Sequence, residues 1–521
     1  MKVPLTPLRF LHRAIDLYPK KVGVVCGPHR FTYAEFGERC QRLAAALVRA
    51  GVQPGDRIAF LSFNTHQLLE GYYGAPQAHA AVMPLNVRLT PSELAAILHH
   101  AEPRILFFEN DFAPVLDLLR AASPSMRAIN LDSEYEDFLS TGVAERANIF
   151  EYDEESLCEL FYTSGSTGTP KGVMLSHRTV YLHAIGAAAA FTQEDTAVDL
   201  HTIPLFHANG WGKPQTATLT GLKQVMVRRF DAPTVFGLIQ GERATRMTLV
   251  PTMANALLMS PDIEKYDLSS MSSIMMGGAA SSPELIERLE RAFQCEVLGG
   301  YGLTESSPVA SLSRKKSTLD YADDTDRYFH QAMAGWPLQG AEIRVADAEM
   351  RDVPRDMTTI GEVLIAGDLI MDGYYKDPEG TAAAITSGWL HTGDMAVWNA
   401  DNFIHIVDRQ KDIIISGGEN ISSIEVEKAI SAHSAVAEAA VIGAPDPTWG
   451  EIPVAIIVLR PGVLCTEPEI HAFISKRVAK FKLPRRYEFR TEPLPKGGTG
   501  KVLKRELREP FWHGKERRVQ G

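Results

Sequence analysis

Short apolar runs alternate with amphipathic segments along the first third of the chain. Four of these runs consist mostly of aliphatic and aromatic residues: 22–27 (VGVVCG), 57–62 (RIAFLS), 81–86 (AVMPLN) and 104–110 (RILFFEN). Because they lack a strict alternation of apolar and polar positions, they are typical of strands that are buried on both faces. We predict one strand at each run.

Helix signals lie between these runs. Thr32 and Glu35 have the spacing of a capping box, and apolar side chains follow at helical intervals up to residue 47. Thr90, Pro91 and Glu93 combine an N-cap, a proline at the first helical position and a second capping box. Strands and helices in alternation predict an α/β fold in which sheets and helices form layers.

The pattern changes after residue 361. Residues 361–367 (GEVLIAG) and 402–408 (NFIHIVD) are typical of strands at sheet edges, and a polar joint, DRQKD, begins at Asp408. A capped helix from Ser422, a strand near 437–445 and a capped helix from Thr466 follow. We therefore expect three parts, and the C-terminal part has a common domain size. They are a large N-terminal domain of layered α/β sheets (1–407), a hinge (408–411) and a small mobile α/β C-terminal domain (412–521).

Composition excludes several classes of protein. Hydrophobic residues make up 45% of the 521 positions and charged residues 22%, close to the averages of soluble globular proteins. The formal net charge is −11 and no lysine- or arginine-rich run occurs, so nucleic acid is not an expected partner. Five scattered cysteines include no CxxC pair, which predicts buried free thiols in a reducing compartment and no metal cluster.

The sequence also bears on location. The N-terminal residues contain no apolar core of a secretory signal, and no apolar run is long enough to span a bilayer. The C-terminal RRVQG is neither a prenylation nor a peroxisomal signal. We expect a cytoplasmic protein without an integral membrane segment, and a homodimer is left open.

Residues 162–172 (YTSGSTGTPKG) form the most unusual stretch. A turn rich in glycine and hydroxyl side chains can surround an anion with backbone N–H groups, and Lys171 adds a positive charge. The GxxxxGK[ST] pattern of P-loop ATPases does not fit, because its second glycine would fall on Pro170. By itself the stretch is equally compatible with a flexible surface loop.

Six further stretches decide between these alternatives. In chain order they are PLFHANGWG (204–212), MMGGAASS (275–282), GGYGLTESSP (299–308), GWLHTGDMAVW (388–398), DRQKDIIISGGENISSIEVE (408–427) and LPKGGTGKVLKREL (494–507). Together, in this order, they closely resemble the adenylate-forming superfamily of acyl-CoA synthetases, peptide-synthetase adenylation domains and luciferases. The resemblance covers nearly the whole chain, and the branch most similar in pattern is the tryptophan-gated medium- and long-chain fatty acyl-CoA synthetases.

The resemblance implies a two-step reaction. Such enzymes use ATP and Mg²⁺ to convert a carboxylate into an acyl adenylate and pyrophosphate, and then pass the acyl group to a thiol such as that of coenzyme A. Adenylation gives the acyl group a good leaving group, AMP. Because the first step gathers negative charge on pyrophosphate, the site requires cations, backbone donors and a metal ion there.

The resemblance also assigns roles to residues around ATP. Glu305 and Thr163 match the Mg²⁺ site, with Thr304 beside them, and Lys501 matches the lysine that bridges the substrate carboxylate and the α-phosphate. The residues that match the phosphate loop are Thr163, Ser164, Gly165, Ser166, Thr167, Gly168 and Lys171. The residues that match the adenine and ribose contacts are Tyr301, Gly278, Gly300, Asp394 and Arg409. A surface salt bridge is the alternative role for Arg409.

The acyl and CoA sides are implied in the same way. His207, Trp211, Gly278, Ala279 and Ala280 match the wall of the acyl pocket, where Trp211 falls at the position of the gating tryptophan or is simply a core residue. Lys411 matches the hinge. The residues that rotation would bring to the thiol tunnel are Gly417, Gly418, Glu419 and Asn420.

Two departures from the family pattern and several alternative functions remain. Gly299 stands where many relatives carry a polar adenine contact, and Asn420 stands where one tryptophan-gated branch has a second tryptophan. We expect a carboxylate–CoA ligase for medium- or long-chain fatty acids, with short branched or thioether acids as the alternative. An amino-acid-activating enzyme that loads a carrier protein and a luciferase-like oxygenase are the rivals. A non-catalytic binding protein is disfavoured because Lys501 and Glu305 are both present.

Overall fold

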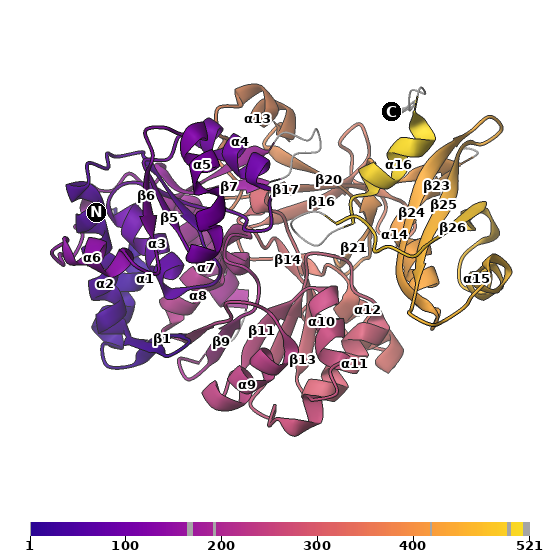
Figure 1. Cartoon of the computed structure of the whole chain (residues 1–521). Coiled ribbons are helices and arrows are strands. Elements are labelled where there is room, and N and C mark those ends of the chain that lie inside the picture. Colours follow the sequence, from indigo (N-terminus) through magenta and orange to yellow (C-terminus); the bar gives the residue numbers. More distant parts are fainter. Residues whose placement is uncertain (1, 164–169, 191–193, 417–418, 497–501, 514–521) are drawn as a thin grey trace. The chain divides into compact units, whose positions relative to one another are not determined.

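The computed structural model describes residues 2–163, 170–190, 194–416, 419–496 and 502–513 (Figure 1). The chain forms two compact units. The larger comprises Met1–Ile343 and Ile365–Leu390, and the smaller comprises Arg344–Leu364 and His391–Gly521. Mixed α/β layers in a large and a small part confirm the predicted fold class, whereas the hinge at 408–411 stays a prediction.

Two mixed sheets form the centre of the larger unit. The strands of the first sheet, in spatial order, are β15 (Trp336–Pro337), β14 (Ser311–Leu312), β13 (Glu296–Tyr301), β12 (Ser273–Met276), β11 (Arg246–Leu249), β9 (Val198–His201), β10 (Lys223–Met226), β1 (Val22–Cys26) and β2 (His29–Thr32). The strands of the second are β18 (Gly373–Tyr374), β8 (Lys171–Ser176), β7 (Leu157–Thr163), β4 (Ala81–Pro84), β3 (Arg57–Leu61), β5 (Ile105–Phe108) and β6 (Arg127–Asn130). The four predicted strands are β1, β3, β4 and β5.

Helices cover these sheets, and α10, α11 and α12 lie beside β11 and β13 in Figure 1. The helices of the larger unit are α1 (Leu8–Leu17), α2 (Tyr33–Arg49), α3 (His66–Gln77), α4 (Pro91–Ala101), α5 (Leu116–Ala122), α6 (Tyr135–Ser140), α7 (His177–Ala190), α8 (Ala208–Thr220), α9 (Ala232–Glu242), α10 (Pro251–Leu258), α11 (Pro283–Phe293), α12 (Asp324–Ala332) and α13 (Pro378–Ala384). Both predicted capping boxes are present, at Thr32 and Thr90.

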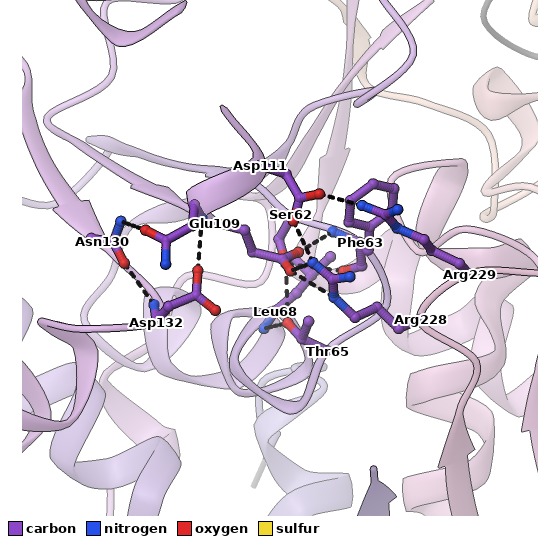
Figure 2. A network of polar contacts seen from close by, with 11 residues as sticks. Ser62, Phe63, Thr65, Leu68, Glu109, Asp111, Asn130, Asp132, Arg228 and Arg229 are labelled. Atoms are coloured by element: carbon purple, nitrogen blue, oxygen red, sulfur yellow. Dashed lines mark hydrogen bonds and ion pairs between the residues drawn. The ribbon is translucent and has the colours of Figure 1, made fainter. Parts of the chain in front are cut away.

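A polar network joins the two sheets at the ends of their strands (Figure 2). The carboxylate of Glu109, just after β5, accepts hydrogen bonds from Ser62 Oγ at 2.9 Å and from Phe63 N at 2.6 Å. Arg228, just after β10 of the other sheet, donates to the same carboxylate through Nε at 2.8 Å. Asp111 binds Arg228 at 2.6 Å and also pairs with Arg229. Because Glu109 is buried, the network holds the carboxyl ends of β3, β5 and β10 together.

One residue of the same region fixes the segment that enters α8. The side chain of Asn64 donates to the carbonyl oxygens of His201 and Ile203 at 2.9 and 3.0 Å, and its Oδ1 accepts from Leu205 N at 2.7 Å. Tyr72 donates to the Leu205 carbonyl at 2.7 Å. The backbone leading to Trp211 is therefore fastened to the neighbouring sheet.

Two further sheets lie mainly in the smaller unit. One has the order β16 (Glu342–Ala346), β17 (Gly361–Ala366) and β20 (Trp389–Trp398), with β21 (Ile404–Arg409) also pairing with β20. The short strand β19 (Ile385–Thr386) pairs with Trp389 and Leu390 of β20, and these residues belong to the larger unit. The other has the order β23 (Glu419–Ile421), β22 (Ile414–Ser416), β25 (Gly450–Leu459) and β24 (Val436–Asp446), with β26 (Arg486–Arg490) on β25. Its helices are α14 (Ser423–Ser431), α15 (Glu467–Ile474) and α16 (Lys504–Trp512).

Two sequence predictions need correction. Strand β17 lies between β16 and β20, so it is not an edge strand. Its apolar run 363–365 is buried on both faces, although the turn residues beside the run had suggested an exposed edge. Among the cysteines, Cys40, Cys158 and Cys295 are buried as predicted, but Cys26 and Cys465 are only half-buried. All five are free thiols, and the capped helices predicted from Ser422 and Thr466 are α14 and α15.

Candidate active site

The candidate nucleotide residues of the larger unit lie where parallel strands end. Strands β12 and β13 run parallel, with Met276 opposite Gly299. Gly278 and Ala279 follow β12 and are exposed with Ala280, while Tyr301 is the last residue of β13. Ligands of open α/β sheets bind beyond the carboxyl ends of such strands. This edge therefore has the expected position for a nucleotide.

The departure at Gly299 has a steric cause. A β-carbon at this position would lie 2.2 Å from the carbonyl oxygen of Met333 and 2.7 Å from that of Gln331. Such separations are not tolerated, so no side chain fits here without moving backbone. The crowding explains why a glycine stands at this position; whether backbone supplies the adenine contact predicted there stays open.

The predicted phosphate loop leaves and re-enters the sheet at one point. Thr163 ends β7 and Lys171 begins β8, and the two residues form the last pair of the antiparallel ladder. The predicted loop residues 164–168 lie outside the described residues. Lys171 Nζ lies 3.7 Å from Asp377 Oδ2 and 4.3 Å from the ring centre of Tyr374. The ammonium group is therefore held at the mouth of the loop.

Tyr374 connects this lysine to the candidate metal ligand. Its hydroxyl donates a hydrogen bond of 3.0 Å to Glu305 Oε1, and Met371 N donates to the Glu305 carbonyl at 2.9 Å. Strand β18, which carries Tyr374, pairs with β8. Burial and the negative charge of Glu305 raise the pKa of Tyr374, so its hydroxyl keeps its proton. Three distant segments thus bring Lys171, Tyr374 and Glu305 together.

Sequence reasoning did not find Tyr374. The residue lies in MDGYYKDPEG, a stretch with ordinary turn composition, and only its pairing with β8 places it beside Glu305. Thr304 and Glu305 begin a short 3-10 helix, Thr304–Ser306, and both are half-buried.

The donor set of Glu305 fits Mg²⁺ bound with a nucleotide. Its Oε1 is occupied by Tyr374, and among the described residues Oε2 has no recorded hydrogen-bond partner. Magnesium commonly binds to one or two carboxylates together with substrate phosphates and waters, so a single protein carboxylate is sufficient. No cluster of three or more His, Cys, Asp or Glu residues in the described ranges forms an all-protein metal site.

The candidate ribose residues belong to the smaller unit. Asp394 on β20 lies opposite Arg409 on β21, and Arg409 Nε is 2.6 Å from Asp394 Oδ1. The Asp394 side chain is 5% exposed and that of Arg409 is 43% exposed. The arginine therefore makes a salt bridge with Asp394, the carboxylate predicted to bind ribose, and its predicted place beside the ribose stays a prediction.

The predicted hinge is a turn anchored by the last described helix. Asp412 N donates to the Arg409 carbonyl at 2.9 Å, and Arg508 of α16 binds the Lys411 carbonyl at 3.1 Å and Asp412 at 2.5 Å. Buried Asp408 accepts from Ser423 N at 2.5 Å. The tunnel candidates are placed only in part. Glu419 is exposed, Asn420 lies in β23, and Gly417, Gly418 and Lys501 are outside the described residues.

The acyl-pocket candidate Trp211 stands in a left-handed turn. The values of φ are 35° at Ala208, 39° at Asn209, 59° at Gly210, 69° at Trp211 and 73° at Gly212. Left-handed backbone costs about 1–2 kcal/mol for each residue with a β-carbon, so the three such residues here store several kcal/mol. His207, half-buried, precedes the turn, and a right-handed helix follows it.

The Trp211 ring packs against the loop after β12. β-Carbons at Gly277 and Gly278 would lie 2.9 and 3.0 Å from its ring atoms, so these glycines leave room for the indole. The ring is half-buried beside an apolar cluster whose members are Ala187, Ala190, Met275, Val309, Leu312 and Leu338. Trp211 therefore borders both the candidate nucleotide edge and a core, which is compatible with either predicted role.

A buried acid lies behind the turn. Glu159 of β7 is fully buried and accepts hydrogen bonds from Asn209 Nδ2 at 2.9 and 3.2 Å and from Gln215 Nε2 at 2.6 Å. No lysine, arginine or histidine of the described ranges forms a recorded ion pair with it. Burial raises the pKa of Glu159 from 4.5 to about 8, against the opposing effect of the Asn209 hydrogen bond.

Because the pKa of Glu159 is raised on folding, we expect the free energy of unfolding to depend on pH. Because its folded-state pKa lies above the unfolded value, the folded chain binds a proton more tightly, and the free energy of unfolding falls as pH rises from about 4.5 to about 8. The contribution is about 1.4 kcal/mol per pH unit. In Glu159→Gln it is absent, so we expect the melting temperature of the variant, relative to the parent, to increase steadily over that window. Thermal melts of both proteins in one buffer series measure this, and a difference that stays constant with pH contradicts it.

Comparison with known proteins identifies the class. Residues 11–375 match the AMP-binding enzyme family and residues 425–501 match the AMP-binding enzyme C-terminal domain. The chain belongs to this family, and the predicted membership of the adenylate-forming superfamily is confirmed.

Named relatives cover almost the full chain. A long-chain-fatty-acid–CoA ligase of Thermus thermophilus is 38% identical over 96% of this chain and 95% of its own length. A peroxisomal butyrate–CoA ligase (AAE11) of Arabidopsis thaliana is 36% identical over 97% of this chain and 93% of its own. The structure of a Mycobacterium tuberculosis fatty acyl CoA synthetase has a TM-score of 0.76 at 29% identity and covers 98% of this chain and 99% of its own. None of the described helices of the present chain combines the length and the apolar character needed to cross a membrane.

Proposed function

We propose that this chain is an AMP-forming acid–CoA ligase that acts on medium- or long-chain fatty acids, with ATP, Mg²⁺ and coenzyme A. The observation that carries the proposal is the meeting of Lys171, Tyr374 and Glu305 at the mouth of the phosphate loop. Adenylate-forming ligase chemistry is common to the named relatives over nearly the entire chain. The chain length of the acid is the part that rests on the Thermus thermophilus relative and on Trp211.

The residues divide the chemistry between two steps. In the first, a carboxylate oxygen attacks the α-phosphorus of ATP, and the bond from that phosphorus to pyrophosphate breaks. In this step Lys171 would offset phosphate charge, Glu305 would hold the metal ion, and Lys501 would draw the carboxylate to the α-phosphate. When bound, Mg²⁺ supplies positive charge to the leaving pyrophosphate. In the second step the CoA sulfur attacks the acyl carbon, the thiol proton is released, and AMP leaves with the former carboxylate oxygen.

The alternatives differ in substrate and acceptor. A short branched or thioether acid is the first, and the relationship to a butyrate–CoA ligase favours keeping it. Loading of an amino acid onto a carrier protein and a luciferase-like oxygenation are the others, and no described residue specifically favours either. A cytoplasmic location and a homodimer remain predictions.

A substrate panel tests the proposal. Purified protein is incubated with ATP, Mg²⁺, CoA and a series of acids from acetate to stearate, with benzoate and amino acids included. AMP, pyrophosphate and acyl-CoA are quantified together. We expect the three products in equal amounts, with the highest kcat/KM for a medium or long chain. Product formation only with short acids would move the proposal to its first alternative, and AMP formation that ignores CoA would contradict the ligase.

Trp211 gives a prediction about selectivity. If its indole blocks the acyl tunnel until ATP arrives, Trp211→Ala lets long acids bind without ATP and broadens the chain-length profile, because removing a large side chain leaves space. Calorimetric binding of a long acid with and without a nonhydrolysable ATP analogue measures the first effect. Trp336→Ala is the matched control, since Trp336 is also half-buried in the larger unit but bonds to the Arg314 carbonyl. A lower melting temperature with an unchanged preferred acid would make Trp211 a core residue only.

A further inference from the structure

Glu159 is surrounded by neutral polar groups. Its partners are two neutral amides, Asn209 and Gln215, which lie 50 and 56 positions away in the chain. The two amides are also joined to each other, because Asn209 Nδ2 lies 2.9 Å from Gln215 Oε1. All three side chains are buried. A closed polar triad of this kind, far from water, fixes the positions of its members more strictly than apolar contacts do.

The triad of Glu159, Asn209 and Gln215 spans the left-handed turn. Asn209 lies inside the left-handed turn and Gln215 lies in the right-handed helix after it, so the triad encloses residues 210–212. Asparagine is the residue with a β-carbon that best tolerates left-handed backbone. Its Oδ1 is buried with no recorded partner among the described residues, so the recorded hydrogen bonds of its side chain all run through Nδ2 to Glu159 and Gln215.

A carboxyl group suits position 159 better than an amide or an apolar side chain does. The two carboxyl oxygens accept the N–H groups of both amides at once. With its raised pKa, Glu159 keeps its proton at neutral pH, and its hydroxyl oxygen can still accept a hydrogen bond as well as donate one. The NH₂ group of a glutamine at 159 only donates, so one of the amides would face a second donor instead of an acceptor. An apolar residue would leave both amides without an acceptor in a buried position, which is costly.

We propose that Glu159, with Asn209 and Gln215, is a specificity-determining positioning residue: it fixes the left-handed turn that sets Trp211 against the Gly277–Gly278 loop and so sets the width of the acyl pocket. This inference rests on the proposed function, in which Trp211 borders the acyl chain. It also links two parts of the reaction, because β7 carries Glu159 and ends at Thr163, the first residue of the predicted phosphate loop.

The experiment compares Glu159→Gln with Glu70→Gln. Glu70 is an equally buried glutamate in the larger unit, but it binds Arg39 at 2.6 Å and Tyr135 at 2.6 Å instead of the turn. We expect Glu159→Gln to raise KM for the preferred acid by about tenfold and to flatten the chain-length profile, with KM for ATP within about twofold of the parent. We expect Glu70→Gln to lower the melting temperature and leave the profile unchanged.

A spectroscopic readout separates positioning from general stability. Glu159→Gln is also made in a Trp211→Phe background, and tryptophan emission is recorded at a temperature where all variants are folded. A change of emission in the parent background that vanishes in the Trp211→Phe background places the effect at Trp211. If Glu159→Gln does not fold, Gln215→Met replaces it in the same experiment. Methionine has a similar volume to glutamine but cannot donate a hydrogen bond to Glu159.

The outcomes are distinct. A parent that forms no acyl-CoA from any acid defeats the proposed function, while the emission readout still reports on the turn. A parent that is active, with variants that keep both the chain-length profile and the Trp211 emission, overturns the positioning role and leaves Glu159 as a purely structural residue.

Discussion

Lys501→Ala is expected to lower acyl-adenylate formation by about a thousandfold, measured as pyrophosphate release from ATP and a fatty acid. The ammonium group is predicted to hold the substrate carboxylate and the α-phosphate together while both are negative, so its loss removes the attraction that permits their approach. The same variant should convert supplied acyl-AMP and CoA to acyl-CoA at a rate within about threefold of the parent, because that step does not use this lysine.

Lys496→Ala is the matched control. Lys496 lies in the same LPKGGTGK stretch, but its ammonium group is paired with Glu438 at 2.7 Å, so its charge is already committed within the smaller unit. We expect both half-reactions of this variant to resemble those of the parent. Equal losses of both half-reactions in Lys501→Ala would show that the lysine supports the fold or a shared binding step.

Lys411→Pro should give the opposite pattern. Lys411 is the third residue of the turn closed by Asp412 N and the Arg409 carbonyl, and proline there restricts φ and is disfavoured at such a position. If rotation about this turn converts the enzyme between its two steps, adenylation survives and thioester formation falls by about a hundredfold. Stopped-flow measurement of each half-reaction tests this.

Lys411→Ala separates the backbone from the side chain. Alanine removes the ammonium group and keeps the rotational freedom of the backbone, so thioester formation should persist. If alanine and proline reduce it equally, the side chain and not the hinge is responsible, and an unchanged rate in Lys411→Pro rules out a pivot at this residue.

Local patterns predicted much of the fold because their causes are local. The capping boxes at Thr32 and Thr90 depend on residues three positions apart, and both are present. The placement of β17 inside its sheet was predicted wrongly, because whether a strand has one neighbour or two depends on β16 and β20 and not on its own composition.

Some residues of the candidate site could be predicted from local motifs, and others could not. Thr163 pairs with Lys171, and Asp394 pairs with Arg409, so residues separated in the sequence motifs lie side by side. The roles of these residues in ATP binding stay predictions. Tyr374 could not be found from sequence alone, since it reaches Glu305 across 69 positions through a two-residue strand. The Glu159 triad could not be predicted for the same reason. The two amides that bind Glu159 lie 50 and 56 positions further along the chain, and only the fold brings them together.

The anchoring of the hinge turn has a consequence for biosynthesis. Lys504 of α16 is half-buried and binds Glu427 at 2.7 Å. Desolvation lowers its pKa, but the carboxylates of Glu427, Asp408 and Asp412 more than offset this, so its pKa is raised and it stays charged. Arg508 of the same helix holds Asp412 from 96 positions further along the chain. Because domains fold as they leave the ribosome, N-terminal parts first, the larger unit can be complete while this turn still lacks both cations. The nascent chain can therefore complete the sheets of the larger unit before Arg508 anchors the turn at 409–412.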